Sequence, residues 1–274
     1  MMAYGTVRLE CERADGTKST GTGFFFHFAR KGDGHVPTVI TNKHVVEGAK
    51  RGKFLLTRLA AGGGPQRGST LPVVVDDFEK QWIAHPDPAV DLCVMPIAPL
   101  VKQAEQQQQN FFTVPCGIDL IPSDSELQDL DQIENVTMVG YPNGLWDQTH
   151  NMPVFRRGIT ATHPALDWNG KPEFMIDAAC FPGSSGSPVF LYDKSGYVDR
   201  RGTTVLGAGR LKLLGVLYAG PQHIAGGAIV MAPAPTSLTP TPVTPIPLNL
   251  GLVVKAKTLH AFEAQFAALN AGAG

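Results

Sequence analysis

Short apolar runs separated by polar residues, glycines and prolines recur along most of the chain. These runs are rich in β-branched and aromatic residues, which favours strands over helices. In the first half we predict strands near Gly5–Cys11, Gly23–Phe28, Thr38–Thr41, Lys53–Leu59, Leu71–Val75 and Asp91–Ile97. A second series is predicted near Asn135–Gly140, Phe155–Thr162, Glu173–Ala178, Pro188–Tyr192, Thr203–Leu206 with Lys212–Ala219, and Leu250–Val254. Two such series indicate an all-β protein with two β-barrels in tandem.

Between the two series lies Lys102–Asp131, a polar segment that includes a run of glutamines. It has neither strand nor helix periodicity, so we predict a connector. The expected organisation is therefore an N-terminal barrel in residues 1–105, a connector in 106–131, a second barrel in 132–254 and a C-terminal helix in 255–274.

Two segments of the second half break the strand pattern. Met231–Pro247 is rich in proline, which cannot enter the interior of a sheet, so we expect an extended polyproline-like loop. It is either a cover or additional binding surface for a nearby pocket, or an inert excursion. Lys255–Leu269 is predicted as an amphipathic helix, because its apolar residues recur at spacings of three and four: Leu259, Phe262, Phe266 and Leu269.

Composition and charge narrow the class of protein. The 274 residues are 43% hydrophobic and 17% charged, with a net charge of −1. That balance gives no general attraction to nucleic acid or to an anionic membrane, so we expect neither as a partner. No apolar run is long enough for a transmembrane helix. Met1–Glu12 carries charges and lacks an apolar core, so no signal peptide is expected.

The cysteines and histidines lack the spacing of a metal site. The four cysteines contain no C-x-x-C pair, and the eight histidines no H-x-x-x-H pair. Without an export signal we expect reduced thiols and a cytoplasmic protein. The cysteines are Cys11, Cys93, Cys116 and Cys180.

Candidate chemistry is concentrated in Cys180–Pro188, where a serine lies among glycines just before an apolar run. Glycines allow close backbone approach, so the N–H groups of Gly183 and Ser185 could bind an oxyanion during acyl transfer. An ordinary surface turn would have the same composition. The α/β-hydrolase motif G-x-S-x-G is excluded, because Ser187 stands where its second glycine belongs.

A serine nucleophile needs a base, and the base needs a carboxylate to orient it. His44 follows a short apolar strand, and Asp91 begins an almost wholly apolar one. Alone, each has an ordinary structural explanation, as an exposed histidine and as a strand cap. Together with Ser185 they occur in the order His, Asp, Ser, one of the few chain orders of a catalytic triad.

These residues resemble the trypsin-like (chymotrypsin-fold) serine peptidases, and are nearer to the high-temperature-requirement and glutamyl-endopeptidase branches than to digestive trypsins. Gly21–Phe25 is similar to the G-S/T-G-F strand, Thr41–Ala49 to T-N-x-H-V-V, Asp91–Val94 to D-L-A-L/V, Val139–Pro142 to the G-Y/N-P turn, and Ile176–Pro188 to T-D-A-x-x-x-P-G-N-S-G-S/G-P. The resemblance implies two six-stranded barrels with the site in the cleft between them. His44 and Asp91 would come from the first barrel and Ser185 from the second. We expect no PDZ domain.

Three departures from that family are informative. Val45 replaces a cysteine that forms a disulfide in digestive trypsins, which agrees with reduced thiols. Ser184 replaces the aspartate that anchors a new N-terminus after zymogen cleavage, so we expect no such activation. A serine expected in the late strand is absent from Leu214–Gly220, which leaves the support of Asp91 open.

The function that the resemblance implies is a serine endopeptidase that acts on polypeptides through an acyl-enzyme and needs no cofactor. Its primary pocket would be lined by Ala179, Cys180, Leu217, Tyr218, Ala219 and Gly220. These residues carry no charge, so we expect cleavage after small or medium apolar residues. Two alternatives remain: an inactive peptidase fold that binds peptides by strand addition, and an esterase with the same triad.

Overall fold

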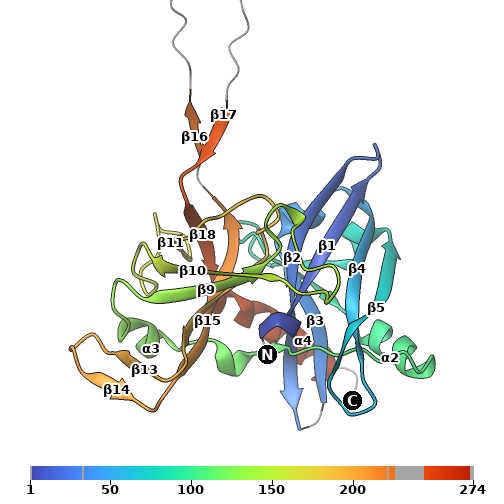
Figure 1. The fold of residues 1–274 in the computed structure, drawn as a ribbon, viewed down its shortest axis with the longest axis horizontal. Helices are drawn as coiled ribbons and strands as arrows, with labels where there is room; N and C mark the ends of the chain where they lie inside the picture. Colours follow the sequence, from blue (N-terminus) through green and yellow to red (C-terminus); the bar gives the residue numbers. More distant parts are fainter. Residues whose placement is uncertain (1, 33, 221, 226–243, 272–274) are drawn as a thin grey trace, which may run out of the picture.

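The computed structural model describes residues 2–271, apart from residues 33, 221 and 226–243. Two β-rich halves lie side by side, and the C-terminal helix lies near their boundary (Figure 1). No helix in the described part of the chain is long and apolar enough to cross a membrane.

The first half is a sheet of eight strands in the order β5-β4-β1-β2-β3-β7-β6, with β8 paired to β2. The long strands correspond to the six predicted from the sequence, and two short strands, β6 and β8, are additional. The strands are β1 (Thr6–Arg13), β2 (Lys18–Lys31), β3 (Gly34–Thr41), β4 (Ala49–Leu59), β5 (Pro65–Asp76), β6 (Ile83–Ala84), β7 (Cys93–Pro96) and β8 (Cys116–Gly117).

Strand β2 is buried on both faces, which explains why its sequence is apolar without alternation. Phe25 faces the core of the first half, where it packs with residues of β1, β4 and β7. Phe24, Phe26 and Phe28 face the other way, into a cluster shared with the second half and the C-terminal helix. A single strand therefore contributes side chains to two hydrophobic clusters.

The second half is a closed barrel in the order β10-β11-β18-β15-β12-β9. The predicted all-β, chymotrypsin-like class is confirmed. Its strands are β9 (Asn135–Gly140), β10 (Val154–Thr160), β11 (Glu173–Asp177), β12 (Pro188–Asp193), β15 (Arg210–Ala219) and β18 (Leu250–Lys255). Two ribbons lie outside the barrel: β13 (Gly196–Val198) with β14 (Thr204–Leu206), and β16 (Gln222–Ala225) with β17 (Thr244–Pro247).

The extended loop predicted for the proline-rich segment Met231–Pro247 is only partly correct, because the segment ends in a strand. Thr244–Pro247 forms strand β17, and the ribbon that it makes with β16 extends away from the barrel at the top of Figure 1. Proline is compatible with this strand because the ribbon has only two strands and both are edges. The preceding residues, 231–243, lie outside the described residues.

The connector has more helix than the sequence predicts. It includes α2 (Ala98–Gln106) and α3 (Asp124–Gln128), with β8 and a 3₁₀ turn, η3 (Ile118–Leu120), between them. In α2 only Ala104 is buried, so no apolar stripe marks it. α3 begins with a capping box, in which Ser123 and Glu126 each accept a hydrogen bond from the other's backbone N–H.

The remaining short elements are α1 (Lys43–Val46), η1 (Met2–Tyr4), η2 (Phe78–Gln81), η4 (Pro142–Gly144) and η5 (Ala256–Leu259). The C-terminal helix α4 (His260–Ala271) follows η5, so the predicted helix starts a few residues later than expected. Leu259, Phe262 and Phe266 are buried as predicted. The side chain of Leu269 is outside the described residues.

Helix α4 follows the second barrel but packs against the first half. Phe262 and Phe266 contact the ring of Phe28 on β2, with centroid distances of 6.1 and 5.4 Å. The Glu263 carboxylate accepts a 2.8 Å hydrogen bond from the backbone N–H of Ala29. Within η5, the Thr258 carbonyl accepts a 3.1 Å hydrogen bond from Nε2 of His85. The chain therefore joins its two halves a second time, beyond the connector.

Candidate active site

His44 lies just after the end of β3, and Asp91 lies just before β7. The fold brings their two side chains together. Their side chains form a 2.6 Å hydrogen bond between Nδ1 and Oδ2. The backbone N–H of His44 donates to Oδ1 of the same carboxylate at 3.3 Å. Asn42, which caps the short helix α1 and is fully buried, donates from Nδ2 to the Asp91 carbonyl at 2.7 Å. One turn of helix therefore fixes both the histidine and the backbone of its carboxylate.

The electrostatics of this pair favour an ionised carboxylate. Burial alone would raise the pKa of Asp91, but hydrogen bonds from the His44 ring and from the backbone N–H groups of His44 and Lys43 lower it below its usual value. A charged Asp91 fixes the tautomer of His44 with the proton on Nδ1, which leaves Nε2 free to accept one.

Tyr218 occupies the late-strand region in which the family serine is missing. Its hydroxyl donates a 2.9 Å hydrogen bond to Oε2 of Glu173, on the neighbouring part of the barrel. Burial, followed by the Glu173 and Asp91 carboxylates, raises the pKa of Tyr218. Asp91 is thus near Tyr218, while its carboxylate accepts hydrogen bonds from His44 and Lys43.

The predicted nucleophile Ser185 follows a tight turn and precedes β12. Its Oγ donates a 3.2 Å hydrogen bond to the backbone carbonyl of Tyr218. Among the described residues no hydrogen bond joins Ser185 to His44. Catalytic hydrogen bonds are often formed only when substrate is bound, so a nucleophilic role for Ser185 would require Oγ to rotate away from the Tyr218 carbonyl.

The backbone before Ser185 forms a hydrogen-bonded turn at the position where the sequence predicts an oxyanion-binding site. The N–H of Ser184 donates to the Phe181 carbonyl at 3.0 Å, and Gly183 has φ = 84° at the third position of this turn, where glycine is favoured. The Pro182 carbonyl accepts a 2.5 Å hydrogen bond from the N–H of Asn143. In a trans peptide the N–H points opposite to the carbonyl, so the Gly183 N–H points away from Asn143.

The backbone N–H groups of Gly183 and Ser185 both lie in this turn. Neither donates a hydrogen bond to any residue that the structure describes. Gly183 could not be replaced without displacement of its neighbours, because an added Cβ would lie 2.6 Å from the Tyr141 carbonyl oxygen. These are the two donors that the sequence predicts for an oxyanion.

Thr22, on β2, braces the nucleophile turn from the first half of the molecule. Its N–H donates to the Ser185 carbonyl at 2.8 Å, and its hydroxyl donates to the Gly183 carbonyl at 2.9 Å. The same hydroxyl accepts from the N–H of Tyr141 at 3.1 Å. Thr41 completes the link, since its hydroxyl donates to the Thr22 carbonyl at 2.7 Å, close to the start of α1.

The predicted pocket walls lie close together on one side of the turn. An added Cβ at Gly220 would lie 3.4 Å from Cβ of Cys180, and one at Gly251 would lie 2.6 Å from both Sγ of Cys180 and Cδ1 of Leu217. Ala219 continues β15 beside them. Gly251 was not predicted, because its place beside Cys180 and Leu217 follows from the pairing of β11 with β18, which no local motif marks.

A cation beside the predicted pocket residues was also missed by the sequence analysis. Arg156, on β10, donates from Nη1 to the carbonyl of Ala179, and its guanidinium carbon lies 4.8 Å from the centre of the Phe181 ring. Its Nε is buried and has no partner among the described residues. Arg156 lies on a strand distant in sequence from the turn, so no local motif marks it.

Comparison with known proteins gives the family of the chain. The family model described as the trypsin-like peptidase domain matches residues 21–198, which include His44, Asp91 and Ser185. The chain belongs to the trypsin-like peptidases. No curated protein matches it.

Solved structures of proteases are similar to this trypsin-like peptidase over most of its length. The active form of the Rv3671c protease from M. tuberculosis is 17% identical with a TM-score of 0.45, over 96% of this chain and 80% of the other. A serine endoprotease from Yersinia pestis is 14% identical with a TM-score of 0.47, over 97% and 63%. The HtrA-type protease AlgW with tripeptide is 16% identical with a TM-score of 0.48, over 98% and 62%. This chain thus spans less than two thirds of the last two.

Proposed function

We propose that this trypsin-like peptidase is a serine endopeptidase that hydrolyses peptide bonds through an acyl-enzyme. The observation that carries the proposal is the 2.6 Å pair of His44 and Asp91 next to a serine turn with two uncommitted N–H groups. Substrate binding would displace the Ser185 hydroxyl from the Tyr218 carbonyl towards His44.

The reaction follows from the groups present. Oγ of Ser185 attacks the peptide carbonyl carbon while Nε2 of His44 takes the hydroxyl proton. The negative charge on the carbonyl oxygen is stabilised by the N–H groups of Gly183 and Ser185. His44 then donates the proton to the leaving amine as the C–N bond breaks, which leaves an ester on Ser185. Water, deprotonated by His44, attacks that ester, and His44 returns the proton to Oγ of Ser185 as the ester C–O bond breaks and the acid is released. Asp91 remains ionised and stabilises the imidazolium.

The pocket favours small or medium apolar side chains before the scissile bond. Cys180, Leu217 and Gly220 provide neutral walls, and a lysine or arginine side chain would enter without a carboxylate partner. Differences among alanine, valine, leucine and methionine should be modest, because a methylene contributes only about 1–3 kcal/mol. A peptide library tests this specificity; cleavage mainly after glutamate or aspartate would instead implicate the guanidinium of Arg156.

Labelling with a fluorophosphonate probe tests the proposed nucleophile. We expect wild type to be labelled at Ser185, and Ser185→Ala to lose both labelling and peptide hydrolysis, by up to about 10⁶-fold in kcat. Ser184→Ala is the matched control, since the Ser184 side chain is buried beside the nucleophile. Activity that persists in Ser185→Ala and is lost in Ser184→Ala would move the nucleophile by one residue.

One observation favours the alternative of a silent peptide-binding module. Oγ of Ser185 donates to the Tyr218 carbonyl instead of to His44. If this arrangement persisted with peptide bound, the chain would bind peptides without cleaving them. Peptide binding in the absence of both labelling and hydrolysis would support that alternative. An esterase would instead be labelled and cleave small esters but no peptide.

We also propose that the protein acts in a reducing compartment, the cytoplasm. All four cysteines are free and buried. Reduced thiols are typical of that environment, whereas disulfides are common in exported proteins. Fractionation of cells that express the full-length protein tests this location.

A further inference from the structure

Arg8, on β1, reaches from the first half of the molecule to a loop of the second. Its Nε donates a 2.9 Å hydrogen bond to the carbonyl of Gly144, and its guanidinium lies over the ring of Trp146, 4.0 Å from the centroid. The side chain is only 16% exposed. A planar guanidinium can make both contacts at once, which a lysine ammonium cannot.

The same loop holds the oxyanion-binding turn. The Asn143 N–H donates to the Pro182 carbonyl, which directs the Gly183 N–H to the opposite side of the peptide plane. An added Cβ at Gly183 would lie 3.1 and 3.2 Å from the backbone nitrogens of Gly144 and Asn143. The residue that Arg8 binds is therefore next to the residue that orients the turn.

Asn143 and Gly144 form a tight left-handed turn beside Arg8. Asn143 has φ = 50° and Gly144 has φ = 69°, a conformation that glycine adopts freely and asparagine tolerates better than most residues. Gly144 is tightly enclosed, since an added Cβ would lie 3.2 Å from Nη2 of Arg8 and 3.3 Å from the hydroxyl oxygen of Thr20.

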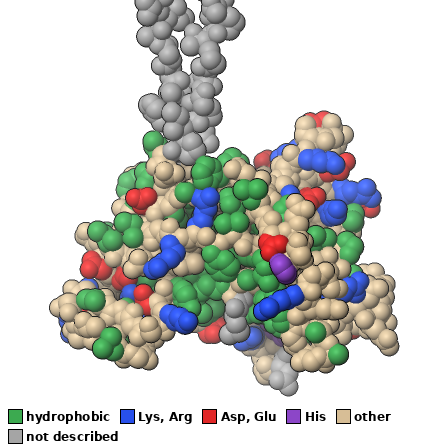
Figure 2. Space-filling model, in the orientation of Figure 1, with side chains coloured by type: hydrophobic (Ala, Val, Ile, Leu, Met, Phe, Trp, Pro, Cys, Tyr) green, Lys and Arg blue, Asp and Glu red, His purple; other side chains and the backbone are tan. Residues whose placement is uncertain are grey.

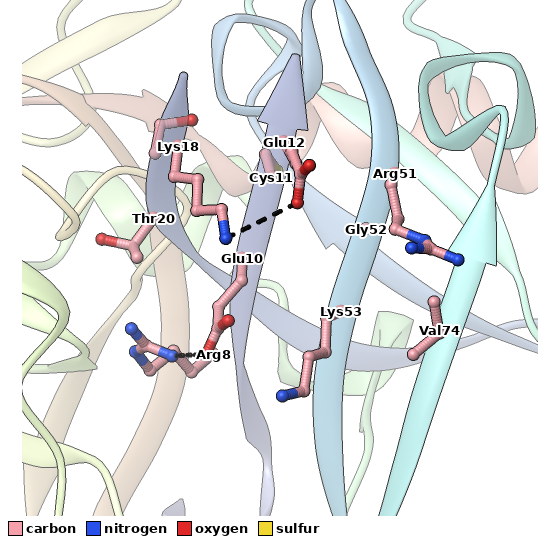
Figure 3. A pocket seen from close by; sticks show the side chains of 11 residues that line it. Arg8, Glu10, Cys11, Glu12, Lys18, Thr20, Arg51, Gly52, Lys53 and Val74 are labelled. Atoms are coloured by element: carbon pink, nitrogen blue, oxygen red, sulfur yellow. Dashed lines mark hydrogen bonds and ion pairs between the residues drawn. The ribbon is translucent and has the colours of Figure 1, made fainter. Parts of the chain in front are cut away.

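Arg8 lies in a charged groove of about 420 Å³ on the outer face of β1, β2 and β4 (Figure 3). Its Nη1 forms an ion pair with Glu10, which orients the guanidinium from the side away from the loop. Lys18 lies in the same groove and pairs with Glu12 at 3.7 Å. Acidic and basic side chains both occur at this end of the molecule, at the upper right of Figure 2. Within the groove, Lys18 offers a comparison for Arg8, because it pairs with Glu12 on β1 and not with the loop of the second half.

We propose that Arg8 is a positioning residue for the oxyanion-binding turn. The inference rests on the proposed peptidase activity. Arg8 holds the loop at Gly144 and Trp146, the loop holds the Pro182 carbonyl through Asn143, and that bond aims the Gly183 N–H. The guanidinium touches neither substrate nor the reacting atoms.

The expected effect is on the transition state and not on substrate binding. The Gly183 N–H makes its strongest hydrogen bond to the oxyanion, which exists only after attack on the carbonyl. Arg8→Ala should therefore lower kcat with little change in KM. Loss of an oxyanion donor reduces kcat by about 10²–10³-fold, so partial misorientation should reduce it by roughly 10-fold.

The test compares variants after each is titrated with a fluorophosphonate, so that rates refer to reactive sites. Arg8→Ala should lower kcat by about 10-fold and weaken a peptide aldehyde, whose hemiacetal oxyanion occupies the same donors, by a similar factor. Arg8→Lys should restore part of the loss, because an ammonium can still donate to Gly144. Lys18→Ala is the matched control and should behave as wild type.

A double-mutant cycle of Arg8 and Trp146 tests whether Arg8 acts on the turn through the loop. Trp146→Ala should lower kcat in the same manner, and the double variant should lose less than the product of the two single effects. Unchanged kcat in Arg8→Ala, an equal fall in Lys18→Ala, or a loss seen only in KM would overturn the inference. If wild type is neither labelled nor active, it is the proposed function that has failed, and the inference falls with it.

Discussion

At the scale of single residues, the hydroxyl of Thr22 fixes the nucleophile turn from across the molecule. It donates to the Gly183 carbonyl and accepts from the Tyr141 N–H and the Ser187 hydroxyl. A hydroxyl has one donor and two acceptor sites, so its hydrogen-bonding capacity is filled. Thr22 is fully buried, and loss of any partner leaves a polar group without water.

Replacement of Thr22 by valine should damage both stability and catalysis. Thr22→Val keeps the shape but removes the hydroxyl, so the Gly183 carbonyl and the Tyr141 N–H lose a partner. We expect a loss of about 1–3 kcal/mol in the free energy of unfolding and a fall in kcat of roughly 10-fold from a looser oxyanion turn. Urea denaturation and steady-state kinetics measure the two effects. Thr22→Ser, which keeps the hydroxyl, should retain most of kcat; equal losses in both variants would contradict this role.

Asp91 allows a second prediction at this scale. Asp91→Asn keeps the size of the side chain but offers His44 an amide, which favours the wrong tautomer. We expect kcat to fall by about 10³–10⁴-fold with a nearly unchanged melting temperature. Activity measured on a peptide substrate at neutral pH, with thermal unfolding alongside, tests it. A fall of less than about 10-fold would mean that His44 acts without this carboxylate.

Site residues differ in how far the sequence could predict them. His44, Asp91 and Ser185 lie in local motifs, and the structure brings His44 and Asp91 into contact. Whether they form a working triad with Ser185 stays a prediction. Arg8 and Asn143 could not be predicted, because each acts through a partner distant in sequence: Gly144 is 136 residues from Arg8, and Pro182 lies in a different segment from Asn143.

At the scale of elements, helix α4 closes one face of the first half. Phe262 is fully buried and contacts both Phe28, at 6.1 Å between centroids, and His85, at 5.2 Å. A phenylalanine in such a site stabilises the fold because its ring is removed from water and because it fills space that would otherwise be a cavity. The helix therefore acts as part of the core of the first half.

Truncation of Phe262 should destabilise the first half. Phe262→Ala should reduce the free energy of unfolding by about 3–5 kcal/mol. Gln265→Ala, one turn away on the exposed side of the same helix, should change it by no more than about 0.5 kcal/mol. Chemical denaturation of both variants gives the comparison. A small effect for Phe262→Ala would mean that α4 is not needed for the fold.

His27, on β2, makes the stability of this sheet depend on pH. Its ring stacks on His35, with centroids 3.8 Å apart. Burial, followed by the positive charges of His35 and Arg30, lowers the pKa of His27 from 6.5 to about 4. The unfolded chain therefore binds a proton more readily than the folded one between these values. The free energy of unfolding therefore has its full value above pH 6.5, the pKa of the unfolded chain. It decreases as the pH falls from there towards about 4.

The variant His27→Phe keeps an aromatic ring and removes this dependence. Between pH 7 and pH 5, we expect wild type to lose about 1 kcal/mol more stability than the variant, a value reduced for partial exposure of the ring. Urea denaturation at the two pH values measures the difference. Identical losses in the two proteins would assign the pH dependence to other groups.

The elements predicted correctly are those with a clear period and clear ends. Strand β9 was predicted with the bounds it has in the structure, because an apolar run between polar residues ends at Gly140. Helices α2 and α3 were missed because they bury one side chain each, Ala104 and Leu127, and so leave no stripe in the sequence. The strand predicted at Thr203–Leu206 is present as β14, but it pairs with β13, which was not predicted, in a ribbon outside the barrel.

At the scale of the whole molecule, the pKa values of the four thiols reflect their burial in the fold. Burial raises the pKa of Cys11 and Cys116 to about 12 and that of Cys180 to about 11, the last partly offset by Arg156. Burial also raises the pKa of Cys93. Thiols react as thiolates, so buried neutral thiols are slow to react.

Thiol titration should distinguish the folded and unfolded protein. In denaturant without reductant we expect all four cysteines to react, as free thiols. In the native protein we expect each thiol to react only when the fold opens around it. The rate of thiol labelling should therefore rise with the urea concentration. Fewer than four reactive thiols in denaturant would indicate a disulfide and would argue against the proposed cytoplasmic location.

The docking of α4 on β2 has a consequence for the order in which the protein folds. The hydrogen bond between Ala29 and Glu263 spans 234 residues, and that between Thr22 and Gly183 spans 161. Contacts of such long range form slowly, because the intervening chain must first be ordered. We therefore expect the nucleophile turn and the sheet that braces it to come together late, after both halves have condensed. A partly folded chain would then lack the proposed active site and would not cleave unfolded copies of itself.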